Sequence, residues 1–185
     1  RKFNENNSFG VLVRLTAQMR SIEDKFIKFA LPYEIVGGPR FFERKEIKDV
    51  LSYLKLANSQ SDDLSFERII NLPRRGIGEQ SIKIIIDHSR SNNLSFFESL
   101  KDLAQLNKLS SSLISKTQPF IDLINKISDL INKTSLEDLG IFVIEESGYL
   151  KMLENEKNKL KQIENESKID NLKELVNALS EFENL

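Results

Sequence analysis

Residues 73–82 read Pro-Arg-Arg-Gly-Ile-Gly-Glu-Gln-Ser-Ile, and this stretch decides how the chain folds. Pro73 ends a short helix predicted over 62–71, and the apolar spacing after the second glycine predicts another helix over 79–90. The two glycines let the backbone reverse between these helices, because a residue without a Cβ tolerates conformations that other residues avoid. The stretch therefore predicts a helix–hairpin–helix in a mainly α fold.

The turn in this stretch is a candidate anion site. The backbone amides of its two glycines and of the isoleucine between them are expected to point outward, beside the positive end of the following helix. Neighbouring cations add to this charge, and the isoleucine is expected to insert between the helices. The candidate site residues are Arg74, Arg75, Gly76, Ile77, Gly78 and Lys83. Such a hairpin holds one strand of a DNA duplex without reading bases; the alternative interpretation is a plain helix–helix turn.

Basic and aromatic residues are interleaved over 40–49 and form a second candidate site. Apolar residues at helical spacing predict a helix from Glu43 onward, and Arg44 and Lys48 fall along one flank of its apolar stripe. Cations beside aromatic rings are typical of nucleic-acid backbone binding. The alternative is that the two phenylalanines of this stretch pack the helix onto its neighbour.

Helical signals continue through the second half of the chain. Ser95 is expected to cap a helix, and 110–133 is expected to be a long helix that Pro119 ends or kinks. Ser135 resembles the start of a capping box and opens a helix that stops at Gly148. The mixed charges after that helix predict a solvated helix or linker over 154–168, followed by a last amphipathic helix.

The N-terminal segment has a different pattern. Short apolar runs at 11–13 and 33–36 predict strands, and a helix is predicted between them over 17–30. A strand, a helix and a strand in this length form a βαβ unit with parallel pairing, which is expected to belong to a larger sheet. Arg14 and Thr16 follow the first strand, where open α/β sheets bind ligands; capping and salt bridging are the alternative.

Composition excludes several kinds of site. The 185-residue chain has no Cys, and its one histidine, His88, has no nucleophile or second ligand beside it in the sequence. We therefore expect no disulfide, no Cys/His zinc site and no catalytic residue, with His88 a surface or partly packed residue. No Gly-x-x-x-x-Gly-Lys-Ser/Thr segment occurs, so the chain is not expected to hydrolyse a nucleotide by itself. No apolar run is long enough for a membrane span.

Charge is distributed unevenly along the chain. The totals of 27 basic and 28 acidic residues exclude a uniformly basic DNA-binding protein. All nine arginines lie in residues 1–90, where 16 basic and 12 acidic residues leave a balance of +4. Arginine suits sites where a planar fork meets phosphate, and ordinary salt bridging is the alternative.

Four stretches together resemble one family, the UvrD/PcrA/Rep group of superfamily 1 DNA helicases. The similarity runs over nearly the whole chain and is most specific over 32–78. The stretches are Val11–Arg20, Pro32–Asp49, Phe66–Gly78 and Glu146–Tyr149. The resemblance implies that residues 1–37 are part of a RecA-like motor domain, called 2A, and that residues 38–185 are the helical 2B subdomain. It also implies a cytoplasmic fragment of an ATP-dependent 3′–5′ DNA helicase that acts in DNA repair or replication.

The resemblance also assigns roles to residues. Arg14 matches an arginine that contacts single-stranded DNA, with Thr16 beside it, and Arg75-Gly76-Ile77-Gly78 matches the element that holds duplex DNA. Arg44 and Lys48 lie in a neighbouring motif that is also near the duplex. ATP and Mg²⁺ are expected to bind the parent protein and not this fragment. The expected partners are single-stranded and duplex DNA, the remaining motor domains of the same chain and DNA-repair proteins.

Two other functions remain open on the sequence. One is a stand-alone repair module that binds DNA through its helix–hairpin–helix, and the other is a helical scaffold for protein interactions. A P-loop encoded upstream would favour the helicase over the module. A duplex titration at low salt separates both from a scaffold with a net charge of −1, which should not bind.

Overall fold

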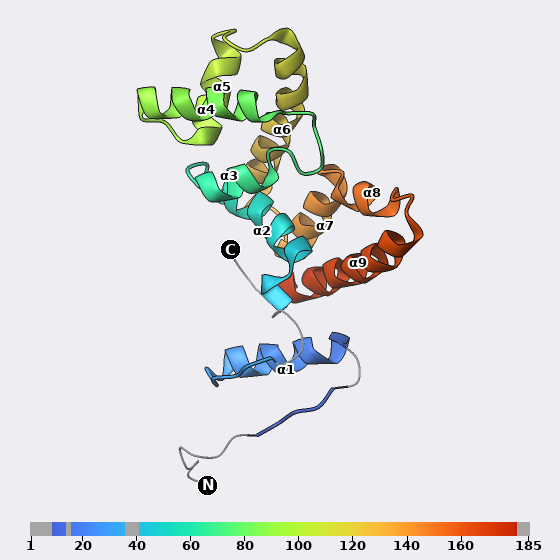
Figure 1. The fold of residues 1–185 in the computed structure, drawn as a ribbon. Coiled ribbons are helices and arrows are strands. Elements are labelled where there is room, and N and C mark those ends of the chain that lie inside the picture. The colour runs from blue at the N-terminus through green and yellow to red at the C-terminus, as the bar shows by residue number, and fades with distance from the viewer. Residues whose placement is uncertain (1–8, 14–15, 36–40, 181–185) are drawn as a thin grey trace. The chain divides into compact units, whose positions relative to one another are not determined.

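The computed structural model describes residues 9–13, 16–35 and 41–180, with the backbone alone at 16–18 and 20 (Figure 1). These residues contain α-helices and one 3-10 turn, Phe41–Glu43, and they contain no strand. The prediction of a mainly α fold is therefore confirmed. The chain separates into two compact units, Arg1–Phe41 and Phe42–Leu185, and each is described by itself.

The described part of unit 1 contains one helix, α1 (Thr16–Lys28), close to the predicted 17–30. Ala30 takes a left-handed backbone with φ 50°, so the chain leaves the helix and turns back. Tyr33 then packs on the helix: its hydroxyl donates to Glu23 Oε1 at 3.1 Å, and its ring centroid lies 5.5 Å from that of Phe26. Side-chain contacts to one helix, and not strand pairing, hold this segment.

The strands predicted at 11–13 and 33–36 do not form in the described residues, which include all but residue 36 of them. Leu12 is fully exposed and Val11 is more than half exposed. A strand needs partners for its amides and carbonyls, and two short parallel strands bury too little surface to supply them alone. The prediction of a βαβ unit is therefore wrong for the residues described here.

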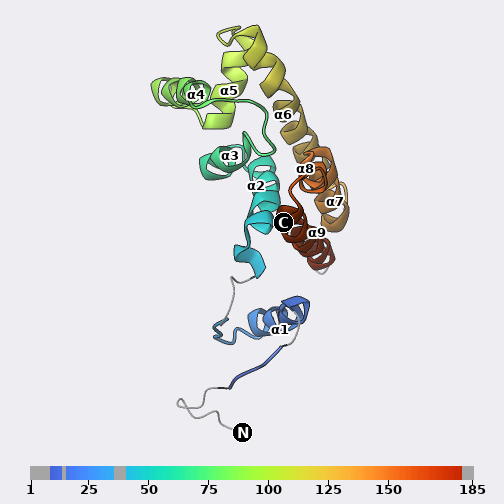
Figure 2. The same ribbon diagram turned by 45° about the vertical axis from the view of Figure 1, so that its right-hand side comes forward.

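Unit 2 is a helical array built around one central helix. Its helices are α2 (Lys45–Asn58), α3 (Asp63–Ile69), α4 (Glu79–Asn92), α5 (Phe96–Gln105), α6 (Ser111–Leu130), α7 (Leu136–Glu146), α8 (Tyr149–Glu154) and α9 (Lys159–Leu179). Helix α2 packs against α3, α6, α7 and α9. Helix α6 runs alongside α2 from α5 to α7, while α4 pairs with α5 and α8 with α9 (Figures 1 and 2).

An aromatic cluster fills the core where α2, α3, α5 and α6 meet. The fully buried ring of Phe120 on α6 meets Phe66, Phe97 and Tyr53 edge-on, at centroid distances of 6.0, 6.1 and 6.4 Å. The sequence predicted that Pro119 ends or kinks the helix; α6 continues through it, so the first of these alternatives is wrong. A proline removes one backbone hydrogen bond, and the burial of Phe120 and its apolar neighbours on α6 compensates for that loss.

Helix ends follow the sequence closely. The Ser95 side chain accepts from the Glu98 amide and the Glu98 carboxylate accepts from the Ser95 amide, so the predicted cap is confirmed as a full capping box. Ser135 caps α7 by accepting from the Asp138 amide at 3.1 Å. The predicted solvated segment 154–168 is a helix from Lys159 onward, because α9 continues unbroken into the predicted last amphipathic helix.

Replacing Asp62 with alanine is expected to lower the free energy of unfolding by about 1 kcal/mol near neutral pH. Asp62 caps α3: its carboxylate accepts from the Ser65 amide at 3.0 Å and from the Ser65 hydroxyl at 2.7 Å, and these bonds lower the pKa of the carboxyl. A lowered pKa stabilises the fold above the unfolded-state pKa of about 3.9, and this contribution is lost as the pH falls through the folded-state pKa.

Urea denaturation of the wild type and the Asp62→Ala variant between about pH 3 and pH 7 tests this expectation. The difference in stability should shrink at the acid end of the range. A difference that stayed constant with pH would contradict a role for the ionised carboxylate.

Candidate nucleic-acid interface

The turn between α3 and α4 is built around the side chain of Asn71. Its Oδ1 accepts from the backbone amides of Arg75 at 2.8 Å and Ile77 at 3.4 Å, and its Nδ2 donates to the Ile77 carbonyl at 2.9 Å. Gly76 has φ +72°, a conformation in which a side chain would be strained. Ile77 is 2% exposed, so its predicted burial is confirmed. One carboxamide therefore fixes the shape of the whole turn.

Two of the three predicted amides remain open. The Gly76 and Gly78 amides have no acceptor in the part of the chain that the structure describes, and both residues are exposed. A Cβ placed on Gly78 would have no atom within 4 Å. The Ile77 amide, in contrast, is used by Asn71. Since Gly78 also caps the start of α4, the open amides lie at the positive end of a 14-residue helix.

The two adjacent arginines point to different environments. Arg74 is exposed, whereas the Arg75 guanidinium lies 5.0 Å from the centre of the Phe120 ring and donates through Nη2 to the Tyr53 hydroxyl at 2.7 Å. Its Nη1 also lies 2.9, 3.2 and 3.3 Å from the carbonyl oxygens of Ile69, Ile70 and Pro73. The sequence predicted that both arginines bind an anion, but the guanidinium of Arg75 is directed into the protein.

Tyr53, Arg75 and Phe120 form a cluster inside the protein, called here the Arg75 cluster. The Tyr53 hydroxyl donates to the Leu72 carbonyl while it accepts from Arg75. Burial raises the pKa of the hydroxyl, although the nearby charge of Arg75 acts in the opposite direction. Tyr53 therefore stays protonated and keeps both bonds, which tie the end of α3 to α2.

Lys116 is a site residue that the sequence did not reveal. It lies on α6, and its Nζ donates to the Gly76 carbonyl at 3.2 Å while the side chain remains exposed. An ammonium group on this carbonyl places a positive charge beside the two open amides. The residue is 40 positions away from the turn, in a helix with no basic pattern, so no local signal could have indicated it.

The remaining candidates differ in their surroundings. Lys83 is exposed on α4, one turn after the open amides, and Lys48 is exposed on α2. The exposed carboxylate of Glu79, in the first turn of α4, opposes an anion there. Arg44 donates to Asn171 Oδ1 on α9 and is half buried. Arg44 therefore joins two helices.

Two predicted site residues, Arg14 and Thr16, belong to the N-terminal unit. Arg14 lies outside the described residues. Thr16 begins α1, but its side chain lies outside them too.

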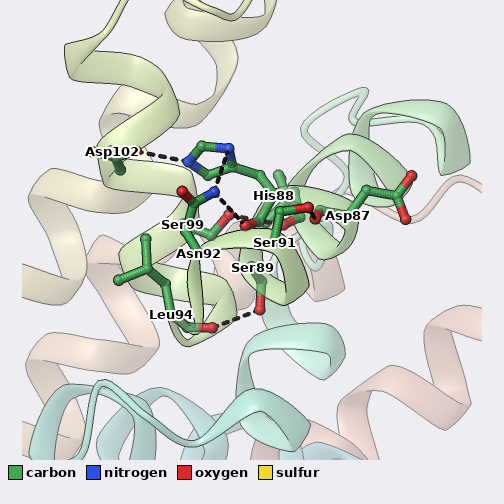
Figure 3. A network of polar contacts seen from close by, with 9 residues as sticks. Asp87, His88, Ser89, Ser91, Asn92, Leu94, Ser99 and Asp102 are labelled. Atoms are coloured by element: carbon green, nitrogen blue, oxygen red, sulfur yellow. Dashed lines mark hydrogen bonds and ion pairs between the residues drawn. The ribbon is translucent and has the colours of Figure 1, made fainter.

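His88 takes part in a structural network between α4 and α5 (Figure 3). Its Nε2 lies 2.7 Å from Asp102 Oδ2, and its Nδ1 lies 3.2 Å from Asn92 Nδ2. The hydroxyls of Ser89 and Ser99 donate to backbone carbonyls and not to the histidine. Among the described residues, neither of these two serine hydroxyls bonds His88.

The described residues hold no cluster of metal-binding side chains. No three or more of their His, Asp and Glu side chains come together in a way that could hold a metal ion. None of the helices in this part of the chain combines the length and the apolar character that a membrane crossing requires.

A second polar network joins α2, α3 and α8. The buried carboxylate of Asp49 accepts from Arg68 Nε and from the Tyr149 hydroxyl, both at 2.7 Å. Gly148, with φ +77°, precedes α8, and a Cβ placed on it would lie 3.9 Å from Pro73 Cγ. The stretches 146–149 and 73–78, far apart in the sequence, are therefore neighbours in the fold.

The known proteins to which this chain is similar are named as DNA helicases. The chain is 38% identical over 172 residues to DNA helicase II of Escherichia coli and 34% identical over 177 residues to ATP-dependent DNA helicase PcrA of Bacillus subtilis. It is 35% identical over 184 residues to a probable DNA helicase II homolog of Rickettsia conorii. These matches cover 93%, 96% and 98% of this chain and 23%, 23% and 27% of the relatives, so the chain spans about a quarter of their length. The family model for the UvrD-like helicase C-terminal domain matches residues 1–185, and the chain therefore belongs to this family of UvrD/PcrA-type DNA helicases.

Proposed function

We propose that this chain is the duplex-gripping part of an ATP-dependent 3′–5′ DNA helicase. Residues 38–185 would form a 2B-type subdomain, and residues 1–37 would belong to a RecA-like 2A domain. The separation of the chain into two compact units at Phe41 and Phe42 supports this division, as do the relatives named DNA helicase II and PcrA. The motor would step along single-stranded DNA, while the 2B subdomain holds the duplex and restrains the motor by swivelling.

The observation that carries the proposal is the open Gly76–Gly78 turn. Two amides without an acceptor among the described residues lie at the start of α4. Exposed cations occur in the loop, on the second turn of α4 and on α6, where one of them bonds the Gly76 carbonyl. These cations are Arg74, Lys83 and Lys116. Backbone amides and ammonium or guanidinium groups are the donors that hold phosphate, and phosphate contacts carry no sequence information. The turn would therefore bind the duplex backbone regardless of sequence.

ATP and Mg²⁺ would bind elsewhere in the parent protein. The sequence of this chain has no Gly-x-x-x-x-Gly-Lys-Ser/Thr segment to cradle the phosphates of a nucleotide. We therefore propose that the chain alone hydrolyses no nucleotide. Its partners would be duplex and single-stranded DNA, the motor domains of the same protein and DNA-repair proteins, in the cytoplasm.

Titration of the 185-residue chain with two duplexes of equal length and unrelated sequence tests the proposal. We expect equal affinities for the two duplexes, and we expect log K to fall with log salt by about 0.9 for each phosphate contacted. The affinities are measured by fluorescence anisotropy at several salt concentrations. Lack of binding at low salt would contradict the proposal and favour the protein-interaction scaffold.

A further inference from the structure

We propose that Arg75 is a positioning residue for duplex binding: its guanidinium locks the end of α3 so that the Gly76 and Gly78 amides face the DNA, while Arg75 itself touches no phosphate. This inference rests on the proposed function of the turn. The two neighbouring arginines, which are equivalent in the sequence, would then have different roles in DNA binding.

The fork of Arg75 holds the backbone that enters the turn. Its Nη1 serves the carbonyls of Ile69, the last residue of α3, and of Ile70, the C-cap, at 2.9 and 3.2 Å. Carbonyls at the end of a helix lack partners within the helix and lie at its negative pole, so a nearby guanidinium is favourable there. The Ile69 carbonyl also accepts from the Leu72 amide at 3.1 Å. The Tyr53 hydroxyl donates a hydrogen bond to the Leu72 carbonyl. Two side chains thus fix the segment just before the turn.

The lock reaches the open amides through Asn71. The backbone amide of Arg75 donates to Asn71 Oδ1, and the same carboxamide bonds Ile77 through both the amide and the carbonyl of that residue. Ile77 stands between the two glycines, so its orientation sets theirs. If the Arg75 side chain lost its bonds, the Arg75 backbone could move away from Asn71 and weaken the bonds between Asn71 and Ile77. The Gly76 and Gly78 amides would then no longer be held in one direction.

Arg75 is poorly placed to act as a phosphate ligand. Its guanidinium lies against the Phe120 ring at 5.0 Å, and its Nη2 is 2.7 Å from the Tyr53 hydroxyl. To reach a phosphate, it would give up its bonds to the hydroxyl of buried Tyr53 and to the Ile70 carbonyl, and unsatisfied polar groups are costly. The exposed Arg74 has no such commitment among the described residues.

Two variants, Arg75→Lys and Tyr53→Phe, test the proposal, with Arg74→Ala as the matched comparison. Arg75→Lys keeps the positive charge but loses the planar fork, and Tyr53→Phe removes one hydroxyl without any change of charge. Each is expected to weaken duplex binding about tenfold, because the turn loses its preorganised shape. The dependence of log K on log salt should stay as in the wild type. Arg74→Ala should instead reduce this slope by about 0.9, since one phosphate would no longer have its cation.

Amide hydrogen exchange provides a readout that does not depend on DNA. Exchange at the Ile77 amide should accelerate in Arg75→Lys and stay unchanged in Arg74→Ala, under conditions where urea denaturation shows every variant to be folded. Wild-type affinity in Arg75→Lys, or a salt slope reduced as in Arg74→Ala, would overturn the positioning role and leave the proposed function standing. Failure of the wild type to bind duplex would overturn both, and the exchange data would then describe only how the turn is ordered.

Discussion

Replacement of Arg74, Lys83 and Lys116 together with glutamate is expected to lower the affinity for duplex DNA by about a hundredfold. All three side chains are exposed, in the loop, on α4 and on α6, so the change turns the attraction for phosphate into repulsion. The slope of log K against log salt, which is negative, should become shallower by about 2.7, or 0.9 for each phosphate that the variant no longer neutralises. Anisotropy titrations over a range of salt concentrations measure both quantities.

This triple variant should remain folded. The three side chains make one polar contact with the rest of the described chain, the bond from Lys116 to the Gly76 carbonyl, and that bond is exposed. Exposed charged contacts contribute little to stability. Thermal unfolding followed by circular dichroism should therefore give nearly the same midpoint as the wild type.

A second triple variant serves as the control for net charge. Lys126, Lys133 and Lys161 are also exposed, and their replacement by glutamate changes the net charge by the same amount. Lys126 is ten residues along α6 from Lys116, about 15 Å at the rise of an α-helix. We expect this control to lose much less affinity. An equal loss in both variants would show that binding follows overall charge and is not located at the turn.

Replacement of Asp49 with alanine is expected to lower the free energy of unfolding by about 4 kcal/mol. Asp49 is 1% exposed, and its two carboxylate oxygens accept from Arg68 Nε and from the Tyr149 hydroxyl. Removal of the carboxylate leaves the Tyr149 hydroxyl and Arg68 Nε without their acceptor, although Arg68 Nη2 keeps the Lys45 carbonyl at 3.3 Å. It also leaves a cavity at the α2–α8 contact. Urea denaturation followed by circular dichroism measures the loss.

The tyrosine in this network acts as a donor at ordinary pH. Burial raises the pKa of the Tyr149 hydroxyl, and the hydrogen bond and charge of Asp49 raise it further. The hydroxyl therefore stays protonated, so Tyr149→Phe should also destabilise the protein, although by less than the loss of the carboxylate.

Asp170 supplies the matched control for Asp49. It pairs with Lys173 at 2.9 Å on the surface of α9, where both side chains are about 70% exposed. Asp170→Ala should change the stability by less than about 0.5 kcal/mol. A similar, small effect of Asp49→Ala would mean that the buried network does not hold α8 on α2.

Local features of the fold were predictable from the sequence alone. The caps at Ser95 and Ser135 depend on contacts three residues away, and the burial of Ile77 follows from an apolar residue between two glycines. The strand predictions at 11–13 and 33–36 failed in the described residues, because a strand requires a partner that sequence periodicity does not supply. Pro119 likewise lies inside a helix because buried neighbours outweigh its local preference.

Residue order was sufficient to establish that a glycine turn with basic neighbours joins two helices. Which of those neighbours face outward depends instead on how the helices pack. Arg74 and Arg75 are adjacent and chemically identical, but Arg75 turns inward because α2 brings the Tyr53 hydroxyl and α6 brings the Phe120 ring to its guanidinium. Lys116 joins the turn from α6 for the same reason: packing between helices brings together residues that no spacing along the chain connects.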